Sequence, residues 1–564
     1  MMAKAEILIR NARVRTGAPG APMADWVAVA GNRIMALGHG DAAGWIGART
    51  RVVDARGATV IPGLNDAHLH LFHGGLALAD LNLAGVRGVP DLRSALDAYR
   101  ARRPGLTFIA AYGAPYDLVS SDRTPNRADL DALCPDLPFL VTADDFHTAW
   151  ANSAALRLAG IERGADVGEG SRIILDANGE ATGELIEFAA MDLIRARNPA
   201  TARHSAAARS PLESLNVTAD ERAADKAVLH AAMSHCASLG LTAVHNMDGS
   251  LYQLELLAEM DRDEGLPVRV RMPFHYQPGQ GPRDLAHAVR WRERFATDRL
   301  TCDFVKIFAD GVIDSGTAHL LADYSHMPGQ RGAALLTDDV LQSVVIEADR
   351  LGFQIAVHCV GDAAVRQVLD AYAAARAANG WRDARHRIEH IELIDPADIP
   401  RFAELGVVAS MQPTHLPWTP EDFLRLLGPD RSRWAFAQAD LRAAGAAIVL
   451  SSDWPVAPVE PFITIAAALT REPWAVAGGK DHRIGLALAL DEMTRAAAWL
   501  SFDEARRGTL VPGALADLAL LDRDLAEAAA EDLPAVGSRL TLCDGQVTHD
   551  PEGLATPVPA HEEA

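Results

Sequence analysis

Short apolar runs that end in glycine, proline or aspartate recur along the chain, and amphipathic stretches rich in alanine, leucine and arginine separate most of the later ones. This alternation is typical of strands joined by right-handed helical crossovers, which build a parallel sheet. Eight such units can close into a (β/α)8 barrel, although the pattern alone also allows an open, doubly wound sheet. The predicted strands span residues 59–66, 241–247, 268–276, 303–311, 353–362, 385–393, 407–415 and 446–455.

The two ends of the chain follow a different pattern. Apolar and polar residues alternate over 5–55 and again over 508–549, as in a small antiparallel sheet. Neither end is long enough to bury a core by itself, so we expect residues 1–58 and 505–550 to pair into one small β domain. The predicted fold class is therefore α/β, with a barrel and a β domain built from both ends.

The segment between the first two predicted strands is far longer than an ordinary connection between a strand and a helix. Because it has helical and strand-like patterns of its own, we expect an insertion or lid subdomain over 74–235, within a barrel that spans 59–504. Residues 196–216, rich in alanine, serine, arginine and proline, are typical of a mobile surface connection. The proline-rich and acidic stretch 551–564 predicts a disordered tail.

The first barrel strand leads into two histidines, His68 and His70. Residues two apart share one face of a strand, so both imidazoles can chelate the same metal ion, although this motif alone is weak. The fourth strand places Lys306 on its inward face between two phenylalanines, where burial lowers the pKa of a lysine. A neutral amine can react with carbon dioxide to give a carbamate that metal ions bind. The alternative is a structural lysine paired with Asp310.

Further strand ends carry groups that can bind metal. His358 ends the fifth strand, His390 the sixth and Asp453 the eighth. Each of them alone is more often a cap or a turn residue, but barrel enzymes place their chemistry at this end of the strands. The joint pattern therefore predicts a metal site, and Gln412 and His415, which close the seventh strand, are expected to line its pocket and bind substrate.

The amino-acid composition limits the kinds of binding partner that we expect for this chain. The 564 residues include 53 lysines and arginines against 75 acidic residues, a formal net charge of −22, which disfavours nucleic acid and anionic membrane surfaces. Five scattered cysteines form no disulfide framework, and no run is long enough for a signal peptide or a membrane span. We expect a cytoplasmic protein with a small-molecule substrate, and a homodimer is compatible with the sequence.

The stretches around these residues, from NDAHLH (65–70) to GTLVPGALADLALLD (508–522), resemble the amidohydrolase superfamily, in particular the branch that includes N-substituted formamide deformylase. The likeness covers nearly the whole chain. It implies a (β/α)8 barrel with a composite β-sandwich built from both ends. It also implies that His68, His70 and Asp453 bind the more buried of one or two divalent ions, and that a carboxylated Lys306 bridges to an ion held by His358 and His390.

The activity that this resemblance implies is hydrolysis of a carbon–nitrogen bond in a small, non-peptide amide or N-substituted formamide by hydroxide that the metal activates. Asp453 would orient the water, accept its proton and pass it to the leaving nitrogen. Zinc suits the ligands, and iron or manganese would also fit. His147 and Trp150, in a segment that resembles the branch, are expected to reach over the site and bind substrate. A single-metal deaminase, a cyclic-amide hydrolase and a non-catalytic scaffold stay open as alternatives.

Overall fold

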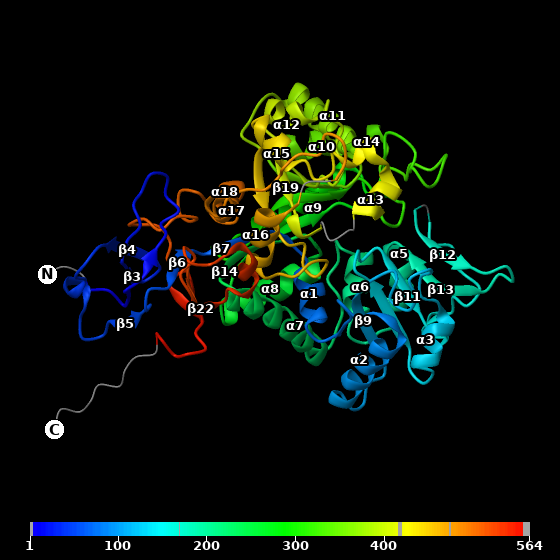
Figure 1. Cartoon of the computed structure of the whole chain (residues 1–564), viewed down its shortest axis with the longest axis horizontal. Coiled ribbons are helices and arrows are strands. Elements are labelled where there is room, and N and C mark those ends of the chain that lie inside the picture. Colours follow the sequence, from blue (N-terminus) through cyan, green and yellow to red (C-terminus); the bar gives the residue numbers. More distant parts are fainter. Residues whose placement is uncertain (1–3, 169, 416–419, 473–474, 556–564) are drawn as a thin grey trace.

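The structure is a computed structural model, and it describes residues 4–168, 170–415, 420–472 and 475–555. Its centre is a parallel sheet curled into a nearly closed barrel (Figure 1). All neighbouring strands in this sheet are parallel. In their order around the barrel, the eight strands are β7 (Leu64–Leu69), β14 (Leu241–Asn246), β15 (Arg269–His275), β16 (Leu300–Phe308), β17 (Gln354–Cys359), β18 (Arg387–His390), β19 (Val408–Met411) and β20 (Ala447–Leu450).

The chain that follows β20 closes the barrel against β7. The backbone N–H of Asp453 donates to the carbonyl of His68, and the N–H of His70 donates to the carbonyl of Trp454, each at 2.8 Å. These two hydrogen bonds replace regular strand pairing between β20 and β7, and they bring the carboxyl ends of the first and last strands together. The predicted barrel is therefore confirmed, and the open-sheet alternative is wrong.

The predicted first strand, 59–66, is in fact two strands. β6 (Thr59–Pro62) pairs with strands of the terminal β domain, whereas β7 pairs with β14 in the barrel. Gly63 separates them, at a place where a Cβ atom would lie only 2.2 Å from Oγ1 of Thr242. Since apolar residues flank this glycine on both sides, the hydrophobic pattern does not show where the chain changes sheet.

Helices cover the outside of the barrel. Outward-facing strand residues such as Val305 and Ile307 are fully buried beneath them in one large core. The helices of this part are α1 (Leu71–Ala77), α7 (Ala219–Ser238), α8 (Leu251–Asp263), α9 (Leu285–Arg294), α10 (Asp338–Arg350), α11 (Asp362–Asn379), α12 (Ile399–Leu405), α13 (Pro420–Leu427), α14 (Pro429–Ser432), α15 (Gln438–Ala443), α16 (Pro461–Thr470), α17 (Leu486–Glu492) and α18 (Arg495–Leu500).

The two chain ends form a two-sheet β domain at the left of Figure 1, and Val29 and Leu520 belong to its shared apolar core. Parallel pairs occur in both sheets, so the expected antiparallel arrangement holds only in part. One sheet has the order β4 (Arg33–Gly38), β3 (Trp26–Ala30), β1 (Ile7–Arg10) and β5 (Arg51–Asp54). The other has the order β2 (Arg13–Val14), β6, β21 (Leu518–Leu521), β22 (Ser538–Cys543) and β23 (Gln546–His549).

The insertion has its own sheet and two apolar cores, at the lower right of Figure 1. The sheet has the order β12 (Arg172–Leu175), β13 (Ala181–Ile186), β11 (Thr148–Ala151), β10 (Phe139–Ala143), β9 (Ile109–Ala114) and β8 (Leu81–Asn82). Its helices are α2 (Gly88–Arg102), α3 (Arg127–Leu133), α4 (Ser153–Ala159), α5 (Phe188–Arg195) and α6 (Ala202–Arg209).

Two details of the insertion differ from the sequence expectation. The segment 196–216 contains α6, whose His204 is buried, so it is more than a surface connection. α7, which begins before residue 235, packs into the core of the barrel. Residues 556–564 of the expected disordered tail lie outside the described part of the chain. None of the helices in the described ranges is long and apolar enough to cross a membrane.

Candidate metal centre and substrate cavity

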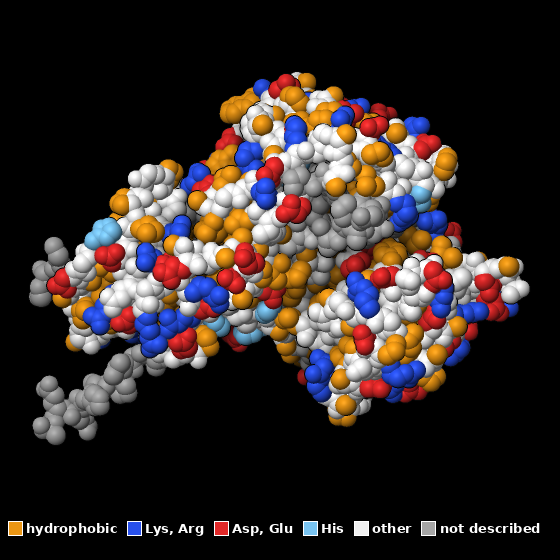
Figure 2. All heavy atoms as spheres, viewed as in Figure 1, with side chains coloured by type: hydrophobic (Ala, Val, Ile, Leu, Met, Phe, Trp, Pro, Cys, Tyr) orange, Lys and Arg blue, Asp and Glu red, His pale blue; other side chains and the backbone are white. Residues whose placement is uncertain are grey.

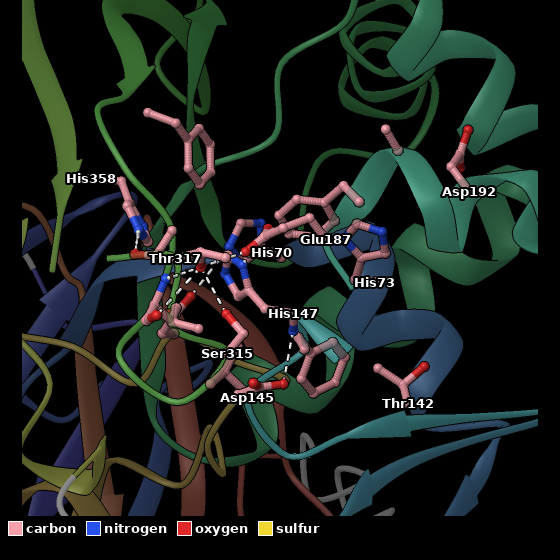
Figure 3. A pocket seen from close by; sticks show the side chains of 18 of the residues that line it. His70, His73, Thr142, Asp145, His147, Glu187, Asp192, Ser315, Thr317 and His358 are labelled. Atoms are coloured by element: carbon pink, nitrogen blue, oxygen red, sulfur yellow. Dashed lines mark hydrogen bonds and ion pairs between the residues drawn. The ribbon is translucent and has the colours of Figure 1, made fainter. Parts of the chain in front are cut away.

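A cavity of about 1130 Å³ lies at the carboxyl ends of the barrel strands, and residues of the insertion complete its wall (Figure 3). Imidazoles and carboxylates share this wall with apolar side chains such as Phe188 and Phe308. In the space-filling view of Figure 2, the insertion forms a lobe of its own, and acidic and basic side chains are interspersed over the face that is drawn. The cavity is thus bounded by two separately packed parts of the chain.

Asp453 lies at the centre of the titratable groups in this cavity. Its Oδ1 atom is 3.2 Å from Nε2 of His68 and 3.2 Å from Nε2 of His70. Burial raises the pKa of Asp453, but His68, His70 and His390 outweigh this effect and hold the pKa well below its usual range. The φ of Asp453 is +61°, in the left-handed region that costs a non-glycine residue free energy, and such strain clusters at functional sites.

His390 joins this group from the end of β18. Its Nδ1 atom is 3.9 Å from Oδ2 of Asp453. One ligand atom each from His68, His390 and Asp453 all lie within 4.8 Å of one another, and the three residues are buried. His358 stands beside His390, with ring centroids 4.5 Å apart. This grouping places His390 with His68, whereas the resemblance assigned His390 to a second ion with His358.

Lys306 lies on the inward face of β16 and is fully buried. Its Nζ atom is 4.7 Å from the centre of the Phe308 ring and has no hydrogen-bond partner among the described residues. Burial lowers the pKa of the Lys306 amine to about 8, against the attraction of nearby carboxylates. Asp310, the alternative partner, accepts instead three backbone N–H groups from the loops that follow β16 and β17.

Two carboxylates that the sequence analysis missed hold the outer nitrogens of the paired histidines. Glu389 lies 2.8 Å from Nδ1 of His68 and is also paired with Arg387, with Nε and Oε1 2.9 Å apart. Asp248 lies 2.8 Å from Nδ1 of His70. A carboxylate in this position fixes the tautomer and the orientation of an imidazole, so Nε2 of each ring is directed to the centre of the site.

Gln412 and His415 have different positions, although both follow β19. Gln412 is not in the cavity wall; its Oε1 is 3.0 Å from Nδ1 of His390, and its Nε2 donates to Ser451. The expectation that Gln412 lines the pocket is corrected to a place behind His390. His415 does line the cavity, with Nε2 3.6 Å from Oδ2 of Asp453 and its ring nearly parallel to that of His390.

The insertion contributes His147, which lines the cavity beside the barrel histidines. Its Nδ1 atom is 2.8 Å from Oε2 of Glu187, and Oε1 of Glu187 accepts from Thr317 Oγ1 at 2.7 Å (Figure 3). Burial lowers the pKa of His147, but Glu187 and nearby aspartates raise it to about 9. Glu187 has a φ of +67°, so a strained backbone position of the insertion carries the carboxylate that holds this imidazole.

Trp150, which we expected beside His147, lies elsewhere. Its side chain is fully buried in the insertion core, with its ring edge on Tyr116 at 5.4 Å between centroids. It is not among the residues that line the cavity. The physical reason is that His147 precedes β11, whereas Trp150 lies within this strand on the face that packs into the apolar core of the insertion.

A sequence profile described as the amidohydrolase family matches residues 51–549. The chain belongs to the amidohydrolase family. The match spans the barrel and the whole insertion, so all the side chains described above fall within it. The resemblance noted in the sequence is thereby confirmed.

Relatives of this amidohydrolase are spread widely. It is 30% identical to the protein LONG AFTER FAR-RED 3 of Arabidopsis thaliana, over 94% of this chain and 89% of that protein. It is 27% identical to N-substituted formamide deformylase of Arthrobacter pascens, over 97% and 99% of the two chains. The crystal structure of an uncharacterized metal-dependent hydrolase from Pyrococcus horikoshii OT3 shares 25% identity and a TM-score of 0.71, over 93% of this chain and 99% of that one.

The side chains of this amidohydrolase fit a divalent cation. Imidazole nitrogens and carboxylate oxygens are ligands that zinc, iron and manganese accept. The grouping of His68, His390 and Asp453 is buried, and buried titratable groups at this density are normally paired or coordinate a metal. The Lys306 amine, which has no hydrogen-bond partner in the described part of the chain, fits the same interpretation, since a carbamate on this nitrogen would present oxygen atoms to a cation.

Proposed function

We propose that this amidohydrolase uses one or two divalent metal ions to hydrolyse a carbon–nitrogen bond, other than a peptide bond, in a small amide or N-substituted formamide. The observation that carries the proposal is the approach of Asp453 to the Nε2 atoms of His68 and His70 inside a cavity of small-molecule size. The proposed metal ligands are His68, His70, Lys306, His358, His390 and Asp453.

A divalent ion, most suitably zinc, supplies Lewis acidity when bound and lowers the pKa of water to about 7. Asp453 provides the proton transfers. Because the histidines around it keep its pKa low, Asp453 is an ionised carboxylate at neutral pH and can accept a proton from the attacking water. It can then deliver that proton to the leaving nitrogen, so that the amine departs as a neutral molecule.

His147 is the proposed substrate-binding group on the side of the insertion. Since Nδ1 is held by Glu187, the Nε2 atom is the one available to a substrate, and a protonated imidazole would donate a hydrogen bond to the carbonyl oxygen. Glu187 is itself held by Thr317 of the barrel loop that follows β16. This contact supports a site that the barrel and the insertion complete together. His415, which follows β19 in the barrel, is the second proposed substrate contact.

Carboxylation of Lys306 is part of the proposal. The neutral amine nitrogen would form a bond to the carbon of carbon dioxide and lose one proton, which leaves an anionic carbamate. Burial without a hydrogen-bonding partner supports this reaction, because the low pKa makes the neutral amine accessible near neutral pH. The charge of the product would be opposite to that of the ammonium ion it replaces.

The test is metal analysis combined with a substrate panel. Purified protein, metal-free protein and protein reloaded with zinc, iron or manganese are assayed for hydrolysis of N-substituted formamides, acyl amides, cyclic ureas and amidines, with amine and ammonia measured separately. Activity that follows the metal content, with release of an amine from a formamide or acyl amide, supports the proposal. Release of ammonia from an amidine at one ion per chain favours a single-metal deaminase, and turnover of cyclic ureas alone favours a cyclic-amide hydrolase.

A further inference from the structure

One wall of the cavity carries a guanidinium group without a direct ionic partner. Arg195, in the last turn of α5, lines the cavity and donates from Nη2 to Oγ1 of Thr142 at a long 3.4 Å. Within the described ranges, no carboxylate oxygen lies within 4.0 Å of its guanidinium nitrogens. Burial lowers the pKa of Arg195, so the group has lost part of its hydration. Asp192 and Asp80 attract Arg195 from beyond ion-pair distance, but the cost of burial outweighs this attraction. A desolvated charge that forms no direct ion pair is stabilised by a ligand that supplies one.

A carboxylate in the same wall shares this property. Asp80, shortly after α1, lines the cavity and has neither a side-chain hydrogen bond nor an ion pair within the described residues. Burial raises its pKa to about 7, against the attraction of Arg103 and Arg195, neither of which approaches within ion-pair distance. Thus Arg195 and Asp80 both line the cavity and attract each other, but they do not form an ion pair.

Another arginine and another aspartate that line the cavity do form an ion pair. Arg209 of α6 and Asp192 of α5 also line the cavity, with Nη1 and Oδ2 2.7 Å apart. In Figure 3, Thr142 and Asp192 lie on the side of the pocket where His73 is found, away from His358. Because Arg195 donates to Thr142, its guanidinium group belongs to this side of the cavity, away from His358.

We propose that Arg195 and Asp80 form a subsite for the head group of an α-amino acid, so that the substrate is an amide whose far end carries both a carboxylate and an ammonium group. Arg195 and Thr142 would bind the carboxylate, and Asp80 would bind the ammonium group. One such ligand satisfies both open charges, whereas a simple anion or a simple amine satisfies only one. This inference rests on the proposed function, because it names the substrate class of the same site.

Matched substrates test the subsite. The first set contains ω-N-formyl derivatives of 2,3-diaminopropionate, ornithine and lysine, which vary the distance between head group and formamide. The second set contains the corresponding ω-N-formylamino acids that lack the α-amine, and the third contains N-formylalkylamines that lack both charges. For the best chain length, we expect kcat/KM to fall about 10- to 100-fold when the carboxylate is removed, as for loss of a hydrogen bond to a charged group. Equal kcat/KM values across the three sets would overturn the inference.

Substitutions of Arg195 and Asp80 test which charged group of the substrate each residue binds. Arg195→Met should raise KM for substrates with a carboxylate about 10- to 100-fold and leave N-formylalkylamines unchanged. Asp80→Asn should reduce only the preference for the α-amine. Arg209→Met is the control, since it removes a guanidinium group that also lines the cavity but already forms an ion pair with Asp192. Should Arg209→Met and Arg195→Met have equal effects on charged substrates, general electrostatics and not a subsite would explain the preference.

A binding measurement separates this inference from the proposed reaction. Isothermal titration of the metal-loaded enzyme uses L-norleucine as the probe, with hexanoate and hexylamine as controls that carry one charge each. We expect norleucine to bind at least about tenfold more tightly than either control, and Arg195→Met to abolish its advantage over hexylamine. If this holds while no amide is hydrolysed, the subsite stands and the proposed reaction fails. If amides are hydrolysed without any effect of the head group, the reaction stands and the subsite is overturned.

Discussion

Removal of the buried Lys306 amine should change the stability of the protein in opposite directions with and without bound metal. We consider Lys306→Met, which keeps most of the unbranched side chain and removes its nitrogen. In metal-free protein, the amine has no hydrogen-bond partner among the described residues, so its charged form is unfavourable. In metal-loaded protein, the proposed carbamate would be a ligand. The substitution should therefore stabilise the first form and weaken metal binding in the second.

The magnitude follows from the pKa. A value of about 8 in the folded protein, against 10.5 for an ordinary lysine, corresponds to roughly 3 kcal/mol at about 1.4 kcal/mol per pH unit. Because the folded protein binds fewer protons than the unfolded chain between pH 8 and 10.5, the free energy of unfolding rises with pH in this window, and below pH 8 the full penalty applies. Lys306→Met should thus gain up to about 3 kcal/mol at pH 7, and the gain should vanish near pH 10.5.

The assay compares thermal unfolding of wild type and Lys306→Met at pH 7 and pH 10, first in chelator and then with zinc and bicarbonate, together with metal content. Lys226→Met is the control, because Lys226 is paired with Glu259 at 2.6 Å near the surface. We expect the variant to be more stable than wild type only without metal, to bind less zinc, and to regain activity partly with short carboxylic acids. Full zinc content and full activity in Lys306→Met would refute the bridging role.

Three other substitutions give separate tests. Asp453→Asn should keep metal better than activity, and equal loss of both in metal analysis and kinetics would show that Asp453 is chiefly a ligand. His147→Ala should raise KM more than it lowers kcat, and Glu187→Gln should have about one tenth to one half of that effect; an unchanged substrate profile in both would reject substrate binding by His147. Burial raises the pKa of Glu492, against Arg442, from 4.5 to about 7, so the free energy of unfolding should fall as pH rises through that window. Glu492→Gln should therefore be more stable than wild type at pH 8 by up to about 3 kcal/mol, with no difference below pH 4.5 in thermal unfolding.

Periodicity was sufficient to predict most of the fold. Each barrel strand except the first coincides with one predicted apolar run, because strands buried on both faces are continuous and apolar. The first run failed at Gly63, where the chain leaves one sheet for another without any change in polarity. The two-sheet core of the terminal domain could be anticipated from the length of each end, but its parallel pairs depend on contacts between residues far apart in the sequence.

Some residues of the candidate site could also be predicted from the sequence, and others could not. His68 and His70 share a strand face, so their common direction could be predicted, and both indeed face Asp453. The position of Glu389 in the site could not be predicted, because strand alternation places its side chain on the face opposite to that of His390. The structure brings both into the site, since His390, the last residue of β18, has a φ of +72°, outside regular strand geometry. Asp248 comes from another strand end, and only the closed barrel brings it to His70.

Anomalous diffraction from crystals of the zinc-loaded protein tests the central claim most directly. We predict a peak among the donor atoms of His68, His70, His390 and Asp453, at about 2.0 to 2.2 Å from the atoms that bind it in the metal-bound protein. A second peak near Lys306 and His358 would establish two ions. A protein that takes up no metal, or a single peak at the neighbouring group of His70, His73 and Asp248, would contradict it.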